Sequence, residues 1–112
     1  MNKEMPKFKV KEGVEKYFQK IENIVWKSNF IQKIETKHKV KIEEVEEILR
    51  GKQKVHRIAR GNVKGEDVYL ALGKTEGGRN LSVFYILKKD NAVLPISARD
   101  MDQKEKRWFK NE

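Results

Sequence analysis

The sequence contains no cysteine and only two prolines among its 112 residues. Without thiols, the chain can form no disulfide, no thiolate nucleophile and no zinc–sulfur site. No stretch approaches the roughly 20 consecutive apolar residues of a membrane helix, and the first residues are charged where a signal peptide would be apolar. The sequence therefore predicts a cytoplasmic protein with no membrane partner.

Hydrophobic residues are also scarce, at 38% of the chain, and charged residues make up another 38%. This length and composition predict one domain over residues 1–112, with a thin core of one sheet covered by a few helices. The 26 Lys and Arg against 17 Asp and Glu give a net charge of +9. An excess of this size attracts polyanions, so it favours a nucleic-acid partner.

The first half of the chain has mainly helical periodicity. The spacing of apolar residues predicts a short helix at 10–20, a strand at 21–26, and helices over 29–37 and 42–50, with Ser28 as the N-cap of the first of these two. One face of the 42–50 helix is acidic, with Glu43, Glu44, Glu46 and Glu47. No histidine stands at a matching position, so we interpret these residues as a solvated face and predict no metal site.

From residue 53 the apolar period changes to two, which predicts strands at 54–60, 67–75, 81–87 and 93–98. Their short connections require antiparallel neighbours, because a parallel crossover needs a dozen or more residues. Pro95 lies inside the last strand, which is therefore expected at an edge or with a bulge. After it, Asp102 and Glu105 have the spacing of a capping box for a final helix.

These elements define an α+β fold. Helices in the N-terminal half pack on a four- to five-stranded antiparallel meander sheet, and a helix follows at the C-terminus.

A series of short motifs carries a more specific signal. In order along the chain they are Trp26, Lys37-His38-Lys39-Val40, Glu43-Glu44-Val45, Arg60-Gly61, Tyr69-Leu70-Ala71-Leu72-Gly73-Lys74-Thr75, Gly78-Arg79-Asn80-Leu81, Ile96-Ser97-Ala98-Arg99 and Glu105-Lys106-Arg107. Their order and spacing over about 21–109 resemble the BrnT family of toxins from type II toxin–antitoxin systems. Residues 1–20 then form a basic N-terminal extension.

The resemblance implies a RelE-like fold and a metal-independent endoribonuclease without a cofactor. It also implies a cognate antitoxin of the ribbon–helix–helix type (BrnA-like), whose complex with the toxin binds operator DNA. Two positions depart from the family pattern: Lys39 stands where the family usually has glycine, and Phe109 where it usually has tyrosine.

Metal-free RNA cleavage needs a base for the 2′-hydroxyl, cations for the pentacoordinate phosphate, and an acid for the leaving oxygen. Histidine suits the proton transfers, and arginine suits the phosphate because it donates two hydrogen bonds at once. The catalytic candidates are His38, Arg79 and Arg99. Each also has a structural interpretation: a polar linker histidine, a solvated hairpin tip for Arg79, and for Arg99 an ion pair with Asp100, Asp102 or a carboxylate of 43–47.

Further cations and one aromatic residue are candidates for binding the RNA strand: Lys37, Lys39, Arg57, Arg60, Tyr85, Lys104 and Arg107. With so many acids on the 42–50 helix, we expect the positive surface to concentrate on the sheet and the last helix. His56 is interpreted as a packing residue. Two alternatives to an enzyme stay open: a non-catalytic module that binds RNA or DNA by charge, and a module that binds an antitoxin-like partner.

Overall fold

The computed structural model describes residues 21, 23–59, 66–88 and 92–111, so the helix predicted at 10–20 and Arg60 lie outside the described residues. The elements are β1 (Asn23–Ile24), α1 (Ser28–Gln32), a π-helix η2 (Lys33–Lys37), α2 (Ile42–Arg50), β2 (Lys54–Ala59), β3 (Val68–Lys74), β4 (Asn80–Leu87), β5 (Ala92–Asp100) and α3 (Gln103–Asn111). The fold is α+β, as predicted.

The five strands form one mixed sheet in the order β1-β5-β4-β3-β2. Strands β2 to β5 pair antiparallel in chain order, as the short connections predicted. The prediction of an entirely antiparallel sheet is wrong at β1, which pairs parallel with β5 through Asn23↔Ala92 and Ile24↔Val93. The whole chain from α1 to β4 lies between these two strands, which is ample length for a parallel crossover.

Pro95 lies in an interior strand, because β5 has β1 on one side and β4 on the other. The prediction of an edge position or a bulge is therefore confirmed through the bulge. The register shifts between the pairs Phe84↔Ser97 and Tyr85↔Pro95. A bulge suits proline because the ring nitrogen has no hydrogen to donate to a regular ladder.

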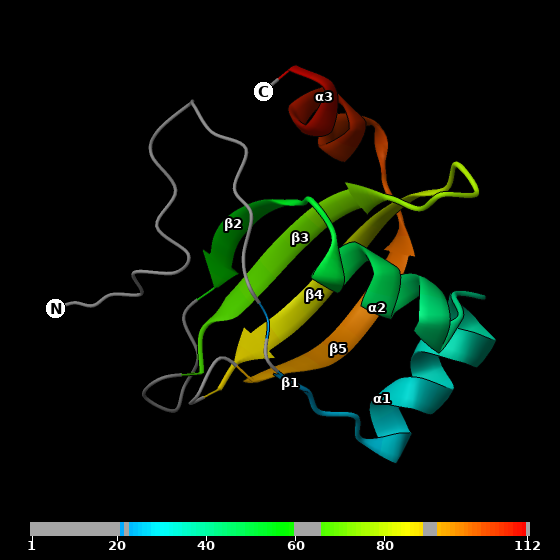
Figure 1. The fold of residues 1–112 in the computed structure, drawn as a ribbon, viewed down its shortest axis with the longest axis vertical. Coiled ribbons are helices and arrows are strands. Elements are labelled where there is room, and N and C mark those ends of the chain that lie inside the picture. Colours follow the sequence, from blue (N-terminus) through cyan, green and yellow to red (C-terminus); the bar gives the residue numbers. More distant parts are fainter. Residues whose placement is uncertain (1–20, 22, 60–65, 89–91, 112) are drawn as a thin grey trace, which may run out of the picture.

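The two faces of the sheet are covered differently. Helices α1, η2 and α2 lie over one face, and α3 lies at one end of the sheet (Figure 1). The larger core joins these helices to the sheet through residues that include Ile34, Val45, Leu49, Val83 and Tyr85. A smaller cluster belongs to α3 and the opposite side of the strands: Leu70, Leu72 and Met101, with Phe84, Trp108 and Phe109 packed against them. Alternate residues of β3 therefore belong to two hydrophobic clusters, one on each face of the sheet.

The helical segment before α2 ends in a π-helix and a residue with a left-handed backbone conformation. The helix predicted over 29–37 is α-helical only to Gln32 and continues as the π-helix η2, and its N-cap is Lys27 instead of Ser28. Lys39 then takes a left-handed backbone conformation with φ of 56°. The Val40 N–H donates to Ile34 O over 3.1 Å, and both side chains are buried. This closure is like a Schellman motif, in which glycine usually occupies the left-handed position.

The last helix begins as predicted. The Glu105 N–H donates to Asp102 Oδ1 over 2.8 Å, and the Asp102 N–H donates to Glu105 Oε1 over 2.9 Å. This reciprocal pair is a capping box. None of the helices in the described part of the chain is long and apolar enough to cross a membrane.

Candidate functional site

The three catalytic candidates come together at one end of the sheet. Arg79 directly precedes β4, and Arg99 lies near the end of β5, paired with Ser82 of β4. His38 follows η2, which packs against β5. Burial lowers the pKa of His38, and so do the charges of Lys37, Lys33 and, least of these, Arg99.

Arg99 is held by a carboxylate of α3. Its Nη1 and Nη2 atoms donate to Glu105 Oε1 and Oε2, each over 2.8 Å, and Nη1 also donates to Asp100 O. The guanidinium carbon lies 5.2 Å from the centroid of the Phe84 ring. The Arg99 side chain is still 35% exposed. Within the described residues, Nε and one N–H of Nη2 have no hydrogen-bond partner. The Arg99 guanidinium group can therefore donate hydrogen bonds to a further anion.

Glu105 joins three elements. Besides the two bonds from Arg99, it accepts a hydrogen bond from Ser82 Oγ of β4 over 2.8 Å and the capping bond from Asp102 N. Burial alone would raise the pKa of Glu105, but the hydrogen bonds from Arg99, the Asp102 N–H and Ser82 outweigh it and leave the pKa below the ordinary value. Glu105 therefore stays ionised and fixes Arg99 in place. The sequence indicated its capping role but not its pairing with Arg99.

Arg79 is fixed more completely than Arg99. Its Nε and Nη2 donate to the two carboxylate oxygens of Asp100, over 2.8 and 3.3 Å. Its Nη1 donates to Glu44 Oε1 and to Lys39 O, each over 3.0 Å. The hydrogen bond from Arg79 also lowers the pKa of Asp100. Arg79 thus connects the β3–β4 turn to β5, to α2 and to the residue after His38, and the interpretation as a solvated hairpin tip is wrong.

His38 is the C-cap residue of η2 and is partly exposed. Its pKa is lowered from 6.5 by burial first, and then by the charges of Lys37, Lys33 and Arg99. Lys39, the residue after His38, is not among these causes. A lowered pKa leaves the imidazole neutral at pH 7, which is the form that accepts a proton.

The candidates for RNA binding are dispersed. Lys37, Lys39, Lys104 and Arg107 are exposed, and Lys104 Nζ lies 5.1 Å from the Trp108 ring centroid. Arg57 belongs to β2 at the opposite edge of the sheet from β1 and pairs with Asp67 over 3.2 Å, so it does not join the three catalytic candidates.

The prediction for Tyr85 is wrong. Its side chain is fully buried under the helices, where its ring stacks on that of Tyr69 with 5.8 Å between the centroids. It is therefore a core residue and cannot reach an RNA base. His56 packs against Trp108 with 5.2 Å between the ring centroids, which confirms its interpretation as a packing residue.

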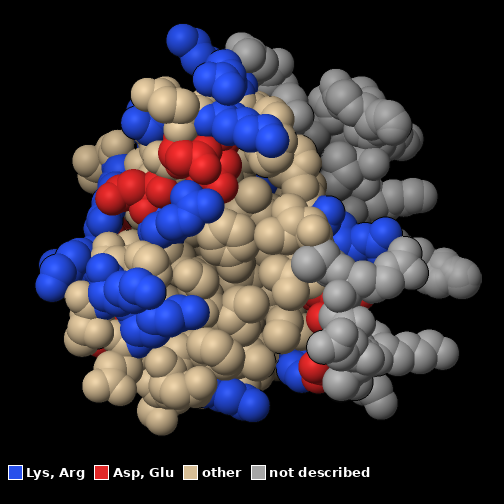
Figure 2. All heavy atoms as spheres, turned by 180° about the vertical axis from the view of Figure 1, so that it is seen from behind, with Lys and Arg blue, Asp and Glu red and all other residues tan. Residues whose placement is uncertain are grey.

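The charge distribution is visible from behind the sheet (Figure 2). Lys and Arg side chains lie over α3 at the top and along one edge, with acidic side chains between them, and the middle of the visible face is uncharged. The expected concentration of positive charge is therefore confirmed for the last helix and wrong for the visible middle of the sheet. Across the described ranges, no three His, Cys, Asp or Glu side chains form a group that could hold a metal ion.

The fold and the site define a small α+β protein with a histidine and two arginines at one end of a mixed sheet. The sequence profile of a family described as the ribonuclease toxin BrnT of type II toxin–antitoxin systems matches residues 26–105. This match covers most of the chain, which therefore belongs to the BrnT family. The family implies an RNA target and an antitoxin partner. A comparison with curated proteins finds no match.

Proposed function

We propose that this toxin is an endoribonuclease that cleaves RNA by attack of a 2′-hydroxyl group, without a metal ion. The observation that carries the proposal is that His38 follows η2, which packs on β5, while Arg99 near the end of β5 still has N–H groups to donate; the lowered pKa of His38 supports it. A neutral imidazole accepts the hydroxyl proton, and a guanidinium fork binds the phosphate oxygens.

In the proposed reaction, His38 takes the proton of the 2′-hydroxyl as the oxygen forms a bond to phosphorus. Arg99 donates to the phosphate oxygens, on which negative charge grows in the pentacoordinate state. The bond from phosphorus to the 5′ oxygen then breaks, and this oxygen leaves with a proton from water. The products are a 2′,3′-cyclic phosphate and a free 5′-hydroxyl.

Arg79 has a different role in this proposal from the one predicted. Four hydrogen bonds to Asp100, Glu44 and Lys39 O use most of its donors. The bond to Lys39 O fixes the backbone next to His38. In this proposal Arg79 is therefore a positioning residue, which acts through the backbone that follows His38.

The family membership supports neutralisation by a cognate antitoxin. We propose a ribbon–helix–helix partner of the BrnA kind, a complex with it that binds operator DNA, a RelE-like arrangement of the toxin, and action in the cytoplasm. The test of the partner is co-expression with a small protein encoded beside the toxin. The two chains should purify together, and the complex should leave RNA intact.

The cleavage chemistry is tested with a short RNA that the protein cuts at one position. Replacing the 2′-hydroxyl at that position by a 2′-O-methyl group should stop cleavage there, and the 5′ product should end in a cyclic phosphate. Continued cleavage of the methylated RNA would contradict attack by the 2′-hydroxyl, because no nucleophile would remain on the sugar.

A second candidate function is binding without catalysis. The engagement of both arginines by carboxylates favours it, because an arginine held in an ion pair has fewer donors for a phosphate. This candidate predicts RNA binding that weakens steeply with salt, and no cleavage at any protein concentration.

A further inference from the structure

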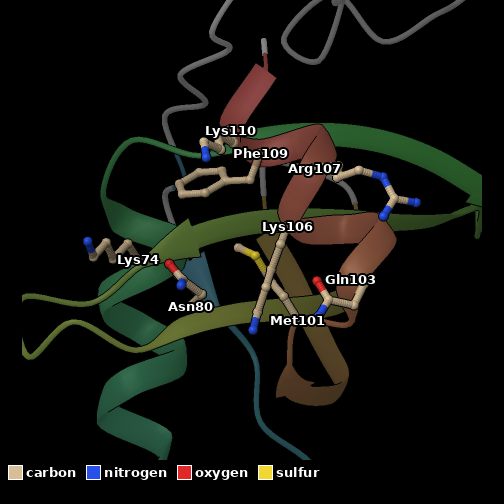
Figure 3. A pocket seen from close by; sticks show the side chains of 8 residues that line it. All are labelled: Lys74, Asn80, Met101, Gln103, Lys106, Arg107, Phe109 and Lys110. Atoms are coloured by element: carbon tan, nitrogen blue, oxygen red, sulfur yellow. The ribbon is translucent and has the colours of Figure 1, made fainter.

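A basic pocket lies between α3 and the adjoining ends of β3 and β4 (Figure 3). Its volume is about 550 Å³, within the range of about 300–1,000 Å³ that ligand sites have. At the strand ends, the pocket is lined by Lys74 of β3 and Asn80 of β4, which are paired with each other in the sheet. The helix contributes Gln103, Lys106, Arg107, Phe109 and Lys110.

The charged residues that line this pocket have one sign, and Asp100 lies within electrostatic range of one of them, Lys106. Four cations line it and no Asp or Glu is among its described lining residues; the cations are Lys74, Lys106, Arg107 and Lys110. In contrast to Arg79 and Arg99, these four have no ion pair to a carboxylate within the described part of the chain. Such a cluster attracts phosphate, and Lys106 extends from α3 toward the strand ends (Figure 3).

The pocket also contains an aromatic ring. The Phe109 ring extends from α3 above Asn80, as Figure 3 shows, and is partly exposed. Lys54 Nζ lies 5.4 Å from the ring centroid and donates to Phe109 O, which holds the ring in place. The carboxamides of Asn80 and Gln103 supply both donors and acceptors within the same pocket. A ring, two amides and several cations match the base and phosphate of one nucleotide.

The pocket is a direct neighbour of the candidate catalytic site. Asn80 follows Arg79 in the chain, and Met101, another lining residue, donates its N–H to Asn80 O over 3.1 Å. Met101 is two residues from Arg99. A strand whose phosphate lies on Arg99 therefore reaches the pocket with an adjacent nucleotide.

We propose that this pocket binds one nucleotide of a single-stranded RNA, next to the phosphate that is cleaved. Lys106 contacts the backbone phosphate, Phe109 stacks on the base, and Asn80 and Gln103 contact the base edge. The proposal rests on the proposed function in that the bound strand is the substrate RNA. In this proposal the pocket is the site at which the toxin contacts a base of the RNA.

The test measures binding to a fluorescent single-stranded RNA in which every sugar is 2′-O-methylated, so that no cleavage occurs. The dissociation constant is determined by anisotropy between 50 and 200 mM salt for the wild type, Lys106→Ala, Phe109→Leu and the control Lys27→Ala. Lys27 is exposed at the start of α1 and does not line the pocket. It matches the charge change of Lys106→Ala. Circular dichroism checks that every variant is folded.

We expect Lys106→Ala and Phe109→Leu each to raise the dissociation constant about fivefold or more, and Lys27→Ala to leave it nearly unchanged. Lys106→Ala should also reduce the salt slope by about 0.7, the value for one phosphate contact on a single strand. If both pocket variants bind as Lys27→Ala does, the pocket is not a nucleotide site. Equal losses on duplex DNA would also overturn the assignment, because a paired base cannot enter the pocket.

The result is independent of catalysis. A wild-type protein that fails to cut ordinary RNA but loses binding through Lys106→Ala would refute the proposed ribonuclease mechanism and leave the pocket intact. A protein that cuts RNA, with binding unaffected by both pocket variants, would refute the pocket alone.

Discussion

Arg99 and Glu105 form an ion pair with two parallel hydrogen bonds, each of 2.8 Å, between the end of β5 and the first turn of α3. The carboxylate is nearly buried, with 8% of its side chain exposed, whereas the guanidinium is 35% exposed. The same contact therefore anchors the last helix and orients the arginine that we assign to the phosphate. Under the proposed function, stability and activity are therefore coupled at this pair.

Glu105→Ala should destabilise the protein by about 2–3 kcal/mol, because it removes a buried acceptor from Ser82 and Arg99 together. Urea unfolding followed by circular dichroism measures the loss. Glu43→Ala is the matched control, since Glu43 is exposed on α2, and it should change the free energy of unfolding by less than about 0.5 kcal/mol. Equal effects of the two substitutions would show that Glu105 does not anchor α3.

The two depressed carboxyl pKa values predict a loss of stability in acid. The folded-state pKa of Glu105 lies below 4.5 and that of Asp100 below 3.8. Both groups therefore contribute stability that is fully present above these values and lost as the pH falls through the folded-state values. The lowered pKa of His38 makes the free energy of unfolding decline gradually below about pH 6.5, and the two carboxyl groups should add a steeper fall below about pH 4. Glu105→Gln, which cannot titrate at this position, should show a smaller fall; an identical pH profile would contradict this explanation.

Lys39→Gly should stabilise the protein by about 0.5–1 kcal/mol. Lys39 has φ of 56°, a conformation that is costly for a residue with a Cβ atom and free of this cost for glycine. Lys37→Gly, inside η2, has the same change of side chain without the positive φ and should destabilise by about 1 kcal/mol. Thermal unfolding of both variants tests the difference. A loss of stability in both would show that the Lys39 side chain outweighs its backbone strain.

The pKa of His38 should lie below 6.5 and respond to its neighbours. NMR titration of the imidazole measures it directly, and the acidic limb of the cleavage rate should follow the same value, since the protonated form cannot act as a base. Lys37→Gln removes one of the charges that lower the pKa, so the titration should move up toward 6.5. An unchanged or lower pKa in this variant would contradict the electrostatic explanation.

Much of the fold follows from local patterns. The alternation in β3 and β4 and the helical spacing of α2 are properties of consecutive residues, and the predicted strands and the 42–50 helix are confirmed within one or two residues. The capping box of α3 is likewise local. The parallel pairing of β1 with β5 was missed because it joins segments about 70 residues apart, and nothing in the two-residue strand indicates its partner.

The candidate site was only partly predictable for a related reason. Sequence order shows which residues can do the chemistry, but not which carboxylates hold them. Arg79 contacts Lys39 and Glu44, which precede it by 40 and 35 residues, and this contact depends on how α2 lies on the sheet. Tyr85 was wrongly predicted to bind RNA. The alternation of side chains along a strand shows that there are two faces, but it does not show which face the helices bury.

Cleavage of RNA in the presence of EDTA tests the central claim most directly. Purified protein should cut a defined RNA with excess chelator, at a rate unaffected by Lys27→Ala. His38→Ala should lower the rate by about 100-fold or more, and Arg99→Lys, which keeps the charge but loses the fork, should also lower it while the protein remains folded. Cleavage that stops on chelation, or that continues at the wild-type rate in His38→Ala, would contradict the assignment of a metal-independent ribonuclease with His38 as its base.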